Sequence, residues 1–133
     1  MTMTAASVGP QQYGKIYESC PTSVRQVRHD VSLALYTWGL DELVDDTQQI
    51  VSELMANAIG HTDSSKIRTT ITKISERTVR LEVTDRSPRE PRLIPADFSE
   101  ESGRGIALVD ALSSRWGWTN NSGDKTVWAE VVG

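Results

Sequence analysis

Residues 53 to 61 carry the side chains of this sequence that are best suited to chemistry. On a helix, Glu53, Asn57 and His61 recur every four residues, so their side chains line one face. A carboxylate and a carboxamide one turn apart can hold a hydrated Mg²⁺ ion and orient a nucleophile. The same spacing also suits an amphipathic helix with three solvated polar residues, and this segment alone leaves both interpretations open.

A second candidate is Asp85, which follows the alternating apolar residues Val79, Leu81 and Val83. This alternation predicts a strand that ends near Asp85. An ionised carboxylate only accepts hydrogen bonds. In a pocket it would therefore select adenine, which offers an amine, over guanine, which offers a carbonyl at the same position. The alternative interpretation is that Asp85 begins a turn before Pro88.

A third candidate is the pair Gly103 and Gly105, with Arg104 between them. Glycines let the backbone approach a phosphate without a clash from Cβ. The amides at the start of the helix that follows would point at the phosphate, and Arg104 would add positive charge. The alternative is a flexible linker before a helix. A dinucleotide-binding motif is excluded because its third glycine would fall on Leu108.

Hydrophobic periodicity predicts the two long helices that support these candidates. The first begins at Thr22 or Ser23, with Gln26 closing a Ser-x-x-Gln capping box, and ends at Gly39. The second covers residues 46 to about 61, and its apolar residues are expected to face a core. These residues are Val51, Leu54, Met55 and Ala58.

Short alternating segments predict the strands of one sheet. The expected strands cover residues 13–18, 67–71, 79–83, 116–118 and 126–132, with turns at 75–77 and 120–123 and a third helix from Gly105. This order predicts an α+β fold. We expect a two-layer sandwich in which a mixed or antiparallel sheet is covered on one face by about three helices.

Length and composition fit one globular domain. The chain has 133 residues, of which 38% are hydrophobic and 24% are charged, enough for one core and too few for two domains. We expect a mobile tail over residues 1–11 and a single domain over 12–133. Prolines and charged residues break the periodicity over 88–102, where we expect a long surface loop.

Charge and motif content exclude several functional classes. The formal net charge of −4 disfavours binding to nucleic acid or to an anionic membrane. No apolar run approaches the roughly 20 residues that cross a bilayer, and residues 1–10 lack the pattern of a secretory signal. Cys20 is the only cysteine, which excludes an internal disulfide and a thiolate zinc site. We therefore expect a cytoplasmic protein.

Three of these segments, taken in order, resemble the GHKL (Bergerat-fold) ATP-binding family of gyrase-type ATPases, sensor histidine kinases and anti-sigma-factor kinases. The Glu53-x-x-x-Asn57 helix is similar to the N box, Asp85-Arg86-Ser87 to the first glycine box and Gly103-Arg104-Gly105 to the second. The resemblance covers most of residues 22–132 and implies the Bergerat-type sandwich. It is strongest to the short, single-domain anti-sigma-factor serine kinases of actinomycetes. Further similar segments are Leu108-Val109, Trp116-Gly117 and Lys125-Thr126-Val127-Trp128.

The resemblance implies a role for each matching residue. Asn57 would coordinate Mg²⁺, and Glu53 would be the general base that takes a proton from a partner's hydroxyl group or from water. Asp85 would bind adenine, with the Thr126 hydroxyl nearby on the last strand. Residues 88–102 would form a lid. The remaining nucleotide contacts would come from Ser87, Gly103, Arg104, Gly105 and Ile106.

One position departs from the family's pattern. The first glycine box of the family has a glycine two residues after the aspartate, and this chain has Ser87, followed by Pro88. Serine adds a Cβ where the backbone passes the base, and proline removes an amide donor. A residue before proline prefers the extended region, where a serine is tolerated.

The resemblance implies an ATP- and Mg²⁺-dependent serine/threonine protein kinase that binds a sigma factor and phosphorylates an antagonist protein. We expect neither the phosphoacceptor helices of a histidine kinase nor a gyrase transducer domain within 133 residues. Two alternatives stay open: a nucleotide-sensing binding module without phosphotransfer, and an interaction protein that binds no nucleotide. A homodimer through the N-terminal strand or the first helix would match related kinases.

Overall fold

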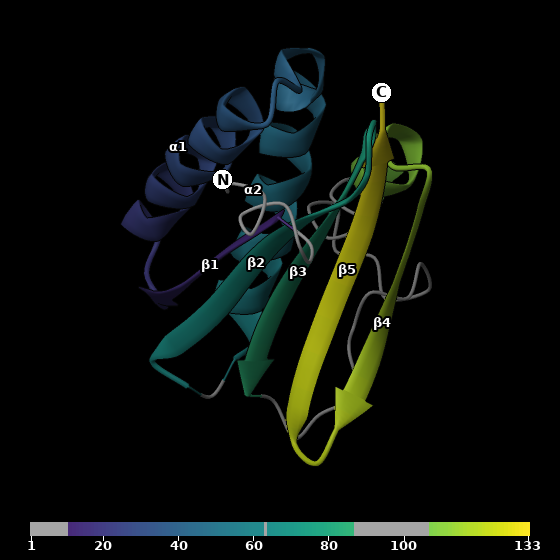
Figure 1. Cartoon of the computed structure of the whole chain (residues 1–133). Coiled ribbons are helices and arrows are strands. Elements are labelled where there is room, and N and C mark those ends of the chain that lie inside the picture. The colour runs from purple at the N-terminus through teal and green to yellow at the C-terminus, as the bar shows by residue number, and fades with distance from the viewer. Residues whose placement is uncertain (1–10, 63, 87–106) are drawn as a thin grey trace, which may run out of the picture.

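The computed structural model describes residues 11–62, 64–86 and 107–133, which form a layer of strands with helices on one side (Figure 1). Residues 107–112 form a further helical segment. The named helices are α1 (Thr22–Thr37), the 3₁₀ turn η2 (Asp41–Leu43) and α2 (Val44–His61). The strands are β1 (Gln11–Glu18), β2 (Lys66–Ser75), β3 (Thr78–Arg86), β4 (Arg115–Asn121) and β5 (Asp124–Val132).

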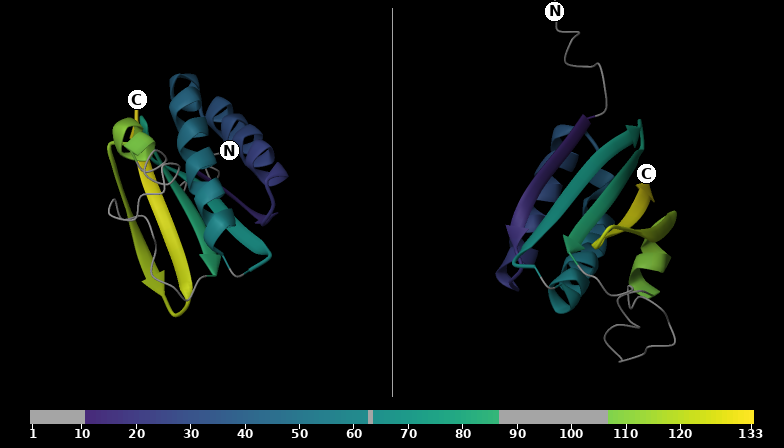
Figure 2. Two further views of the ribbon diagram at one scale, coloured as in Figure 1. Left: turned by 180° about the vertical axis from the view of Figure 1, so that it is seen from behind. Right: turned by 90° about the horizontal axis from the view of Figure 1, so that it is seen from below.

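The five strands form one sheet in the order β1-β2-β3-β5-β4, and every neighbouring pair is antiparallel. Seen from behind, α1 and α2 lie side by side on one face of this sheet (Figure 2). Helix α1 contacts β1 and β2, and α2 contacts β3 and β5. The predicted α+β sandwich is therefore confirmed, with a sheet that is antiparallel throughout the described strands.

The core lies between the helices and the sheet because each element buries one face. In α1, the buried residues Val27, Val31 and Leu35 recur every four positions, as a helical stripe requires. In β3, every second residue is buried, as expected for a strand with one covered face. The residues predicted to line α2 are all buried: Val51, Leu54, Met55 and Ala58.

Helix α1 ends at Thr37, two residues before the glycine that the sequence indicated. Gly39 has φ 72°, a left-handed conformation that glycine adopts without strain. The Leu40 N–H donates to the Leu35 carbonyl oxygen at 2.9 Å, and the Gly39 N–H donates to that of Tyr36 at 3.1 Å. These two bonds satisfy carbonyl groups of the last turn and stop the helix.

The capping box predicted at the start of α1 is wrong. Pro21 precedes the helix with φ −59° and ψ −30°, and no side chain caps the helix. Because proline fixes φ near the helical value, it preorganises this turn without a capping group. Ser23 is buried, and its hydroxyl oxygen lies 3.5 Å from Cys20 Sγ.

The hairpin between β4 and β5 is longer than predicted. Ser122 and Gly123 have φ values of 53° and 94°, which are typical of a two-residue type I′ turn. The turn predicted over 120–123 therefore shortens to two residues. Strand β5 begins at Asp124, two residues before the predicted start at Thr126, and this extension brings Lys125 into the sheet.

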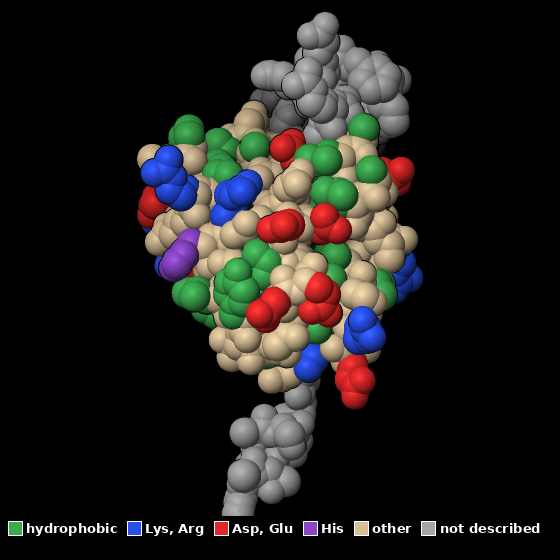
Figure 3. Space-filling view, turned by 90° about the horizontal axis from the view of Figure 1, so that it is seen from above, with side chains coloured by type: hydrophobic (Ala, Val, Ile, Leu, Met, Phe, Trp, Pro, Cys, Tyr) green, Lys and Arg blue, Asp and Glu red, His purple; other side chains and the backbone are tan. Residues whose placement is uncertain are grey.

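One end of the molecule is acidic. Figure 3, which views the molecule from above, shows acidic side chains gathered among hydrophobic ones. The turn η2 and the first turn of α2 contribute Asp41, Glu42, Asp45 and Asp46. Acidic residues at the start of α2 complement the positive end of its dipole, and they give this end no attraction for nucleic acid.

Two further predictions, on membrane-spanning segments and on the N-terminal tail, can be compared with the described residues. No helix of the described part is long and apolar enough to cross a bilayer. Gln11, assigned to the tail from sequence, begins β1, and the tail residues 1–10 lie outside the described part of the chain.

Candidate functional site

The polar face of α2 lies next to its buried face. Glu53 and Asn57 are one turn apart, and both are half-buried. The helix therefore presents a carboxylate and a carboxamide at the edge of the layer between helix and sheet, where their oxygens can reach a ligand. His61 is the last residue of α2, but its side chain lies outside the described structure, so its role stays a prediction.

Hydrogen bonds between the helices fix the turn that carries Glu53. Arg28 Nη1 donates to Ser52 Oγ at 2.7 Å, and Ser52 Oγ donates to the Gln48 carbonyl oxygen at 2.7 Å. Gln48 Nε2 in turn donates to the Arg28 carbonyl oxygen at 3.3 Å. Because Ser52 directly precedes Glu53, rotation of α2 about its axis would break these bonds. They therefore hold the direction in which Glu53 points.

The end of α2 is joined to the end of β3. The Thr62 hydroxyl, just after the helix, donates to the Arg86 carbonyl oxygen at 3.2 Å. Asn57 lies five residues before Thr62, about 7.5 Å along the helix axis. Asp85 is the neighbour of Arg86. Asn57 and Asp85 therefore lie at the same end of the layer between α2 and β3.

Asp85 is inside the fold and does not begin a turn. It is the last residue but one of β3, and its side chain is 1% exposed. Its direct cross-strand neighbour is Lys125 of β5, whose side chain is 3% exposed. Lys125 Nζ lies 3.8 Å from Asp85 Oδ2. The interpretation of Asp85 as a turn residue before Pro88 is therefore wrong, and the site contains a buried ion pair.

The position predicted for Thr126 is wrong. Alternate residues of a strand point to opposite faces, so Thr126 points away from the face that carries Asp85 and Lys125. Its Oγ1 lies 2.8 Å from Oγ1 of Thr84, its cross-strand neighbour on β3. The Thr126 hydroxyl therefore faces the side of the sheet opposite α1 and α2. Lys125, and not Thr126, lies beside Asp85.

Lys125 was not among the predicted site residues, because the predicted strand began one residue later, at Thr126. The buried positions Val127, Ala129 and Val131 alternate along β5. Extending that alternation backwards by one step reaches Lys125, so the signal was present in the sequence. A charged residue at such a position is uncommon in a core, which is why the pattern alone argued against it.

Strand β4 adds aromatic and amide groups to the same face. Register places Trp118 opposite Val127 and Asn120 opposite Lys125. Trp118 is 41% exposed although it points to the helix side, because β4 is an edge strand. Trp116 Nε1 donates to Asp110 Oδ1 at 2.9 Å, which ties β4 to the helical segment 107–112.

The predicted phosphate-binding residues precede that helical segment. Ser87, Gly103, Arg104, Gly105, Ile106 and the lid over 88–102 lie outside the described residues, and their roles stay predictions. The segment that follows them is held firmly. Val109 is fully buried, and the Ser114 N–H donates to the Glu130 carbonyl oxygen at 2.8 Å.

A metal site made only of protein ligands is absent from the described part of the chain. No group of three or more His, Cys, Asp or Glu side chains there could hold a metal ion. Mg²⁺ commonly takes only one or two protein ligands and fills its remaining positions with phosphate oxygens and water. The Asn57 carboxamide fits this mode of binding.

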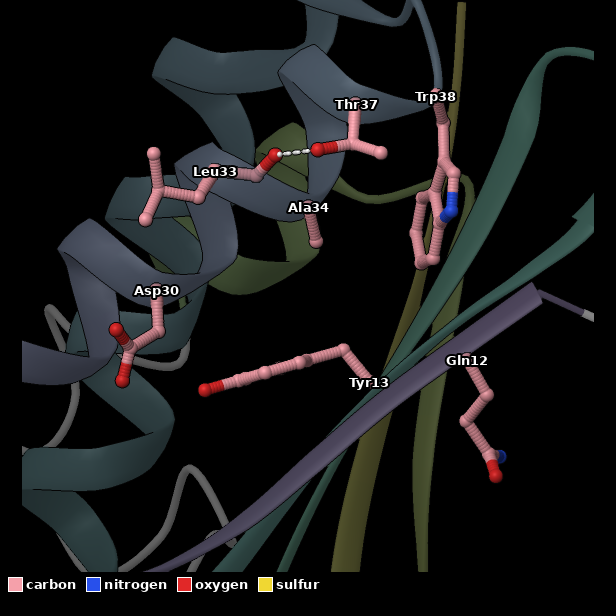
Figure 4. A pocket seen from close by; sticks show the side chains of 7 residues that line it. All are labelled: Gln12, Tyr13, Asp30, Leu33, Ala34, Thr37 and Trp38. Carbon is pink, nitrogen blue, oxygen red and sulfur yellow. Dashed lines mark hydrogen bonds between the residues drawn. The ribbon is translucent and has the colours of Figure 1, made fainter.

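A cavity of about 330 Å³ lies away from these residues, between β1 and α1 (Figure 4). Tyr13, Asp30 and Trp38 are among the residues that line it. Beside it, the Tyr17 hydroxyl donates to Asp30 Oδ2 at 2.7 Å. Burial and then the Asp30 carboxylate raise the pKa of Tyr17, so the phenol stays a neutral donor. The cavity shares none of its lining residues with the predicted site.

Comparison with known proteins identifies relatives over most of the chain. The model of a family described as histidine kinase-like ATPase domain matches residues 17–131. An uncharacterised protein of Streptomyces coelicolor is 35% identical over 86 residues, which are 62% of this chain and 82% of that protein. The family match over residues 17–131 includes both the α2 segment and the β3 strand that carry the candidate residues.

Two solved structures resemble the fold. The crystal structure of the RsbU and RsbW domains of Rv1364c from Mycobacterium tuberculosis aligns with a TM-score of 0.70 at 20% identity, over 92% of this chain and 32% of that one. The Acinetobacter baumannii histidine kinase AdeS aligns with a TM-score of 0.55 at 13% identity, over 92% of this chain and 68% of that one. The chain thus spans 32% of the first of these structures.

Proposed function

The chain belongs to the histidine kinase-like ATPase domain family, and from this membership we propose that it binds ATP with Mg²⁺ and phosphorylates a Ser or Thr of a regulatory protein. The observation that supports this most is the convergence of two elements. The polar face of α2 and the buried Asp85 of β3 meet at one end of the domain, where Thr62 bonds to Arg86.

The proposed site assigns each group a chemical task. Asp85 accepts a hydrogen bond from the adenine amine, and Asn57 offers its carbonyl oxygen to Mg²⁺. Glu53 takes the proton from the attacking hydroxyl, whose oxygen bonds to the γ-phosphorus as ADP leaves. Ser87, Gly103, Arg104, Gly105 and Ile106 complete the nucleotide contacts in this proposal.

The proposed biological role is that of an anti-sigma-factor kinase in the cytoplasm. The RsbW domain in the similar Mycobacterium tuberculosis structure supports this choice at the level of the fold. The chain would bind a sigma factor and phosphorylate an antagonist protein. It would contact neither nucleic acid nor membrane, in keeping with its net charge of −4.

Nucleotide binding is tested by thermal unfolding with and without Mg-ATP. A ligand at 100 times its dissociation constant contributes roughly 2.7 kcal/mol to stability, so the midpoint of unfolding should rise clearly. Mg²⁺ alone and AMP, which lacks the phosphates, are the controls. An unchanged midpoint at millimolar Mg-ATP would reject nucleotide binding.

Phosphotransfer is tested with Glu53→Gln. We expect this variant to keep its affinity for ATP and to lose phosphotransfer to the antagonist protein by about 100-fold or more, because a general base contributes that much. Glu76→Gln, in the exposed turn between β2 and β3, is the matched control and should keep full activity. Transfer of labelled phosphate from ATP, counted on the antagonist, is the measurement.

A non-catalytic nucleotide sensor is the second candidate function. Ser87, at the position of the family's glycine, and Pro88 after it favour this candidate, because serine adds a Cβ and proline lacks an amide donor. ATP binding would then change a partner surface without any reaction. In that case the Glu53→Gln variant would regulate its partner protein as strongly as the wild type does. Neither protein would transfer phosphate to a Ser or Thr of the partner.

We further propose that two copies pair through β1 and α1. Among the described strands, β1 has a neighbour on one side only, so its other edge is available to pair with a second strand. Leu33 and Tyr36, on the outward face of α1, are 51% and 54% exposed. Two identical edges can pair antiparallel about a two-fold axis, which makes this surface self-complementary.

A further inference from the structure

Lys125 is the feature of the site that the predicted roles leave unexplained. Its ammonium group lies 3.8 Å from Asp85 Oδ2, and the two side chains are 3% and 1% exposed. Removing two charges from water is costly, and a buried ion pair is often no more stable than a well-packed apolar pair. Stability alone therefore gives little reason to keep a lysine here.

Lys125 also occupies the centre of a polar row. Register aligns Asp85 of β3, Lys125 of β5 and Asn120 of β4 on the helix-facing side of the sheet. Directly opposite residues in antiparallel strands have Cβ atoms about 4.5–5.5 Å apart. An acceptor, a donor and a carboxamide thus stand next to one another where β3 ends.

We propose that Lys125 is a second residue that recognises the base. This proposal rests on the proposed binding of ATP. Adenine carries its amine, a donor, next to ring nitrogens that are acceptors, N1 on one edge and N7 on the other. A carboxylate beside an ammonium group complements such an edge. Asp85 accepts from the amine, and Lys125 donates to the adjacent ring nitrogen.

The test uses ATP analogues in which N1 or N7 is replaced by C–H, named 1-deaza-ATP and 7-deaza-ATP. Titration calorimetry of the wild type should show one analogue binding about ten-fold more weakly than ATP, because a hydrogen bond to a charged group is lost. Lys125→Met should bind ATP and that analogue equally. Lys66→Met, which removes a surface lysine paired with Glu18, should keep the ten-fold difference.

A double variant keeps the test possible if Lys125→Met alone does not fold. If Lys125→Met leaves Asp85 too unfavourably buried to fold, Asp85→Asn with Lys125→Met removes both charges, and it too should bind ATP and the analogue equally. Two results would overturn the proposal: both analogues binding the wild type as tightly as ATP, or a folded lysine variant that keeps the ten-fold difference. Failure of ATP itself to bind the wild type would instead reject the proposed function.

Discussion

At the scale of single residues, the buried pair of Asp85 and Lys125 has consequences for stability as well as for recognition. Each charge is tolerated in the interior because the other lies 3.8 Å away. The chain also contains a comparable pair at the surface, in the adjacent cross-strand position of β3 and β5. Arg86 Nε lies 3.7 Å from Asp124 Oδ1, and both side chains are at least half exposed.

We predict that Asp85→Asn lowers the free energy of unfolding by about 3 kcal/mol, because it leaves the Lys125 ammonium group in the interior without its carboxylate. Asp124→Asn should cost less than about 1 kcal/mol, since exposed pairs contribute little. Urea denaturation of the two variants without nucleotide measures both values. Equal losses of unfolding free energy in the two variants would show that burying the pair does not affect stability.

The sequence predicted the candidate site only as a set of residues, and Thr126 shows what such a prediction misses. Residue type and spacing single out Glu53, Asn57 and Asp85, and their roles stay predictions. Thr126 and Lys125 are adjacent, so exchanging their roles requires a shift of one residue, and such a shift reverses every side chain of a strand. The length of the hairpin turn at Ser122 and Gly123 decided this, and the sequence pattern was compatible with a longer turn.

At the scale of elements, ion pairs join neighbouring strands on the face of the sheet opposite α1 and α2. Glu130 of β5 accepts from Arg115 Nε at 2.8 Å and from Arg80 Nη1 at 2.8 Å. The Arg80 guanidinium also lies 4.1 Å from the centre of the Trp128 ring. Hydrogen bonds from Arg115, and then from Arg80, hold the pKa of Glu130 below its ordinary value of 4.5, against the opposing effect of burial.

This arrangement predicts a particular dependence of stability on pH. Because the pKa of Glu130 is lower in the folded than in the unfolded chain, its contribution is complete above pH 4.5 and is lost as the pH falls through the folded-state value. Glu130→Gln should therefore be less stable than the wild type at neutral pH, and the difference should shrink in acid. Denaturation of both proteins at a series of pH values measures this difference.

Two glycines give opposite predictions on substitution by alanine. A Cβ on Gly117 of β4 would lie 2.9 Å from Cζ2 of Trp128, whose ring covers this glycine. Gly117→Ala should therefore lower the free energy of unfolding by about 1–3 kcal/mol. Gly60 of α2 has no described residue within 4 Å of such a Cβ, and Gly60→Ala should raise stability by up to about 1 kcal/mol. A stable Gly117→Ala variant would mean that the Trp128 ring moves freely.

The elements themselves were largely predictable because each has a strong local signal. The stripe of Val27, Val31 and Leu35 identified α1, and Gly39 marked its end. The start of α1 was predicted wrongly because a proline can begin a helix without the capping hydrogen bond that the Ser-x-x-Gln pattern suggests. Strand pairing, which depends on contacts between distant residues, could be assigned only as a fold class.

At the scale of the whole molecule, the proposed nucleotide site and the proposed pairing surface lie apart. The residues proposed to bind nucleotide lie where α2 and β3, the middle strand of the sheet, end, whereas the proposed pairing surface lies on β1, at one edge of the sheet, and on α1. Between them, Arg28 of α1 bonds to Ser52 of α2. A partner bound on α1 would therefore contact the helix that is bonded to the turn of Glu53.

The proposed pairing of two copies predicts that a single substitution on the pairing surface halves the mass of the protein in solution. Leu33→Glu places a charge on the outward face of α1 and should convert a dimer into a monomer in analytical ultracentrifugation, because a charge cannot be buried unpaired. Ile74→Glu is the matched control, since Ile74 is also an exposed hydrophobic residue but belongs to β2. A wild type that remains monomeric at high concentration contradicts the pairing.

The strand order has a consequence for how this protein matures on the ribosome. Among the described strands β5 comes last in the chain, yet it lies between β3 and β4 and pairs with both. During synthesis β4 emerges before β5, its described partner, so β4 cannot join the sheet until residues 124–132 have been made. The lysine beside Asp85 arrives with that strand, so a nascent chain cannot form the buried pair of Asp85 and Lys125 until translation has passed Lys125.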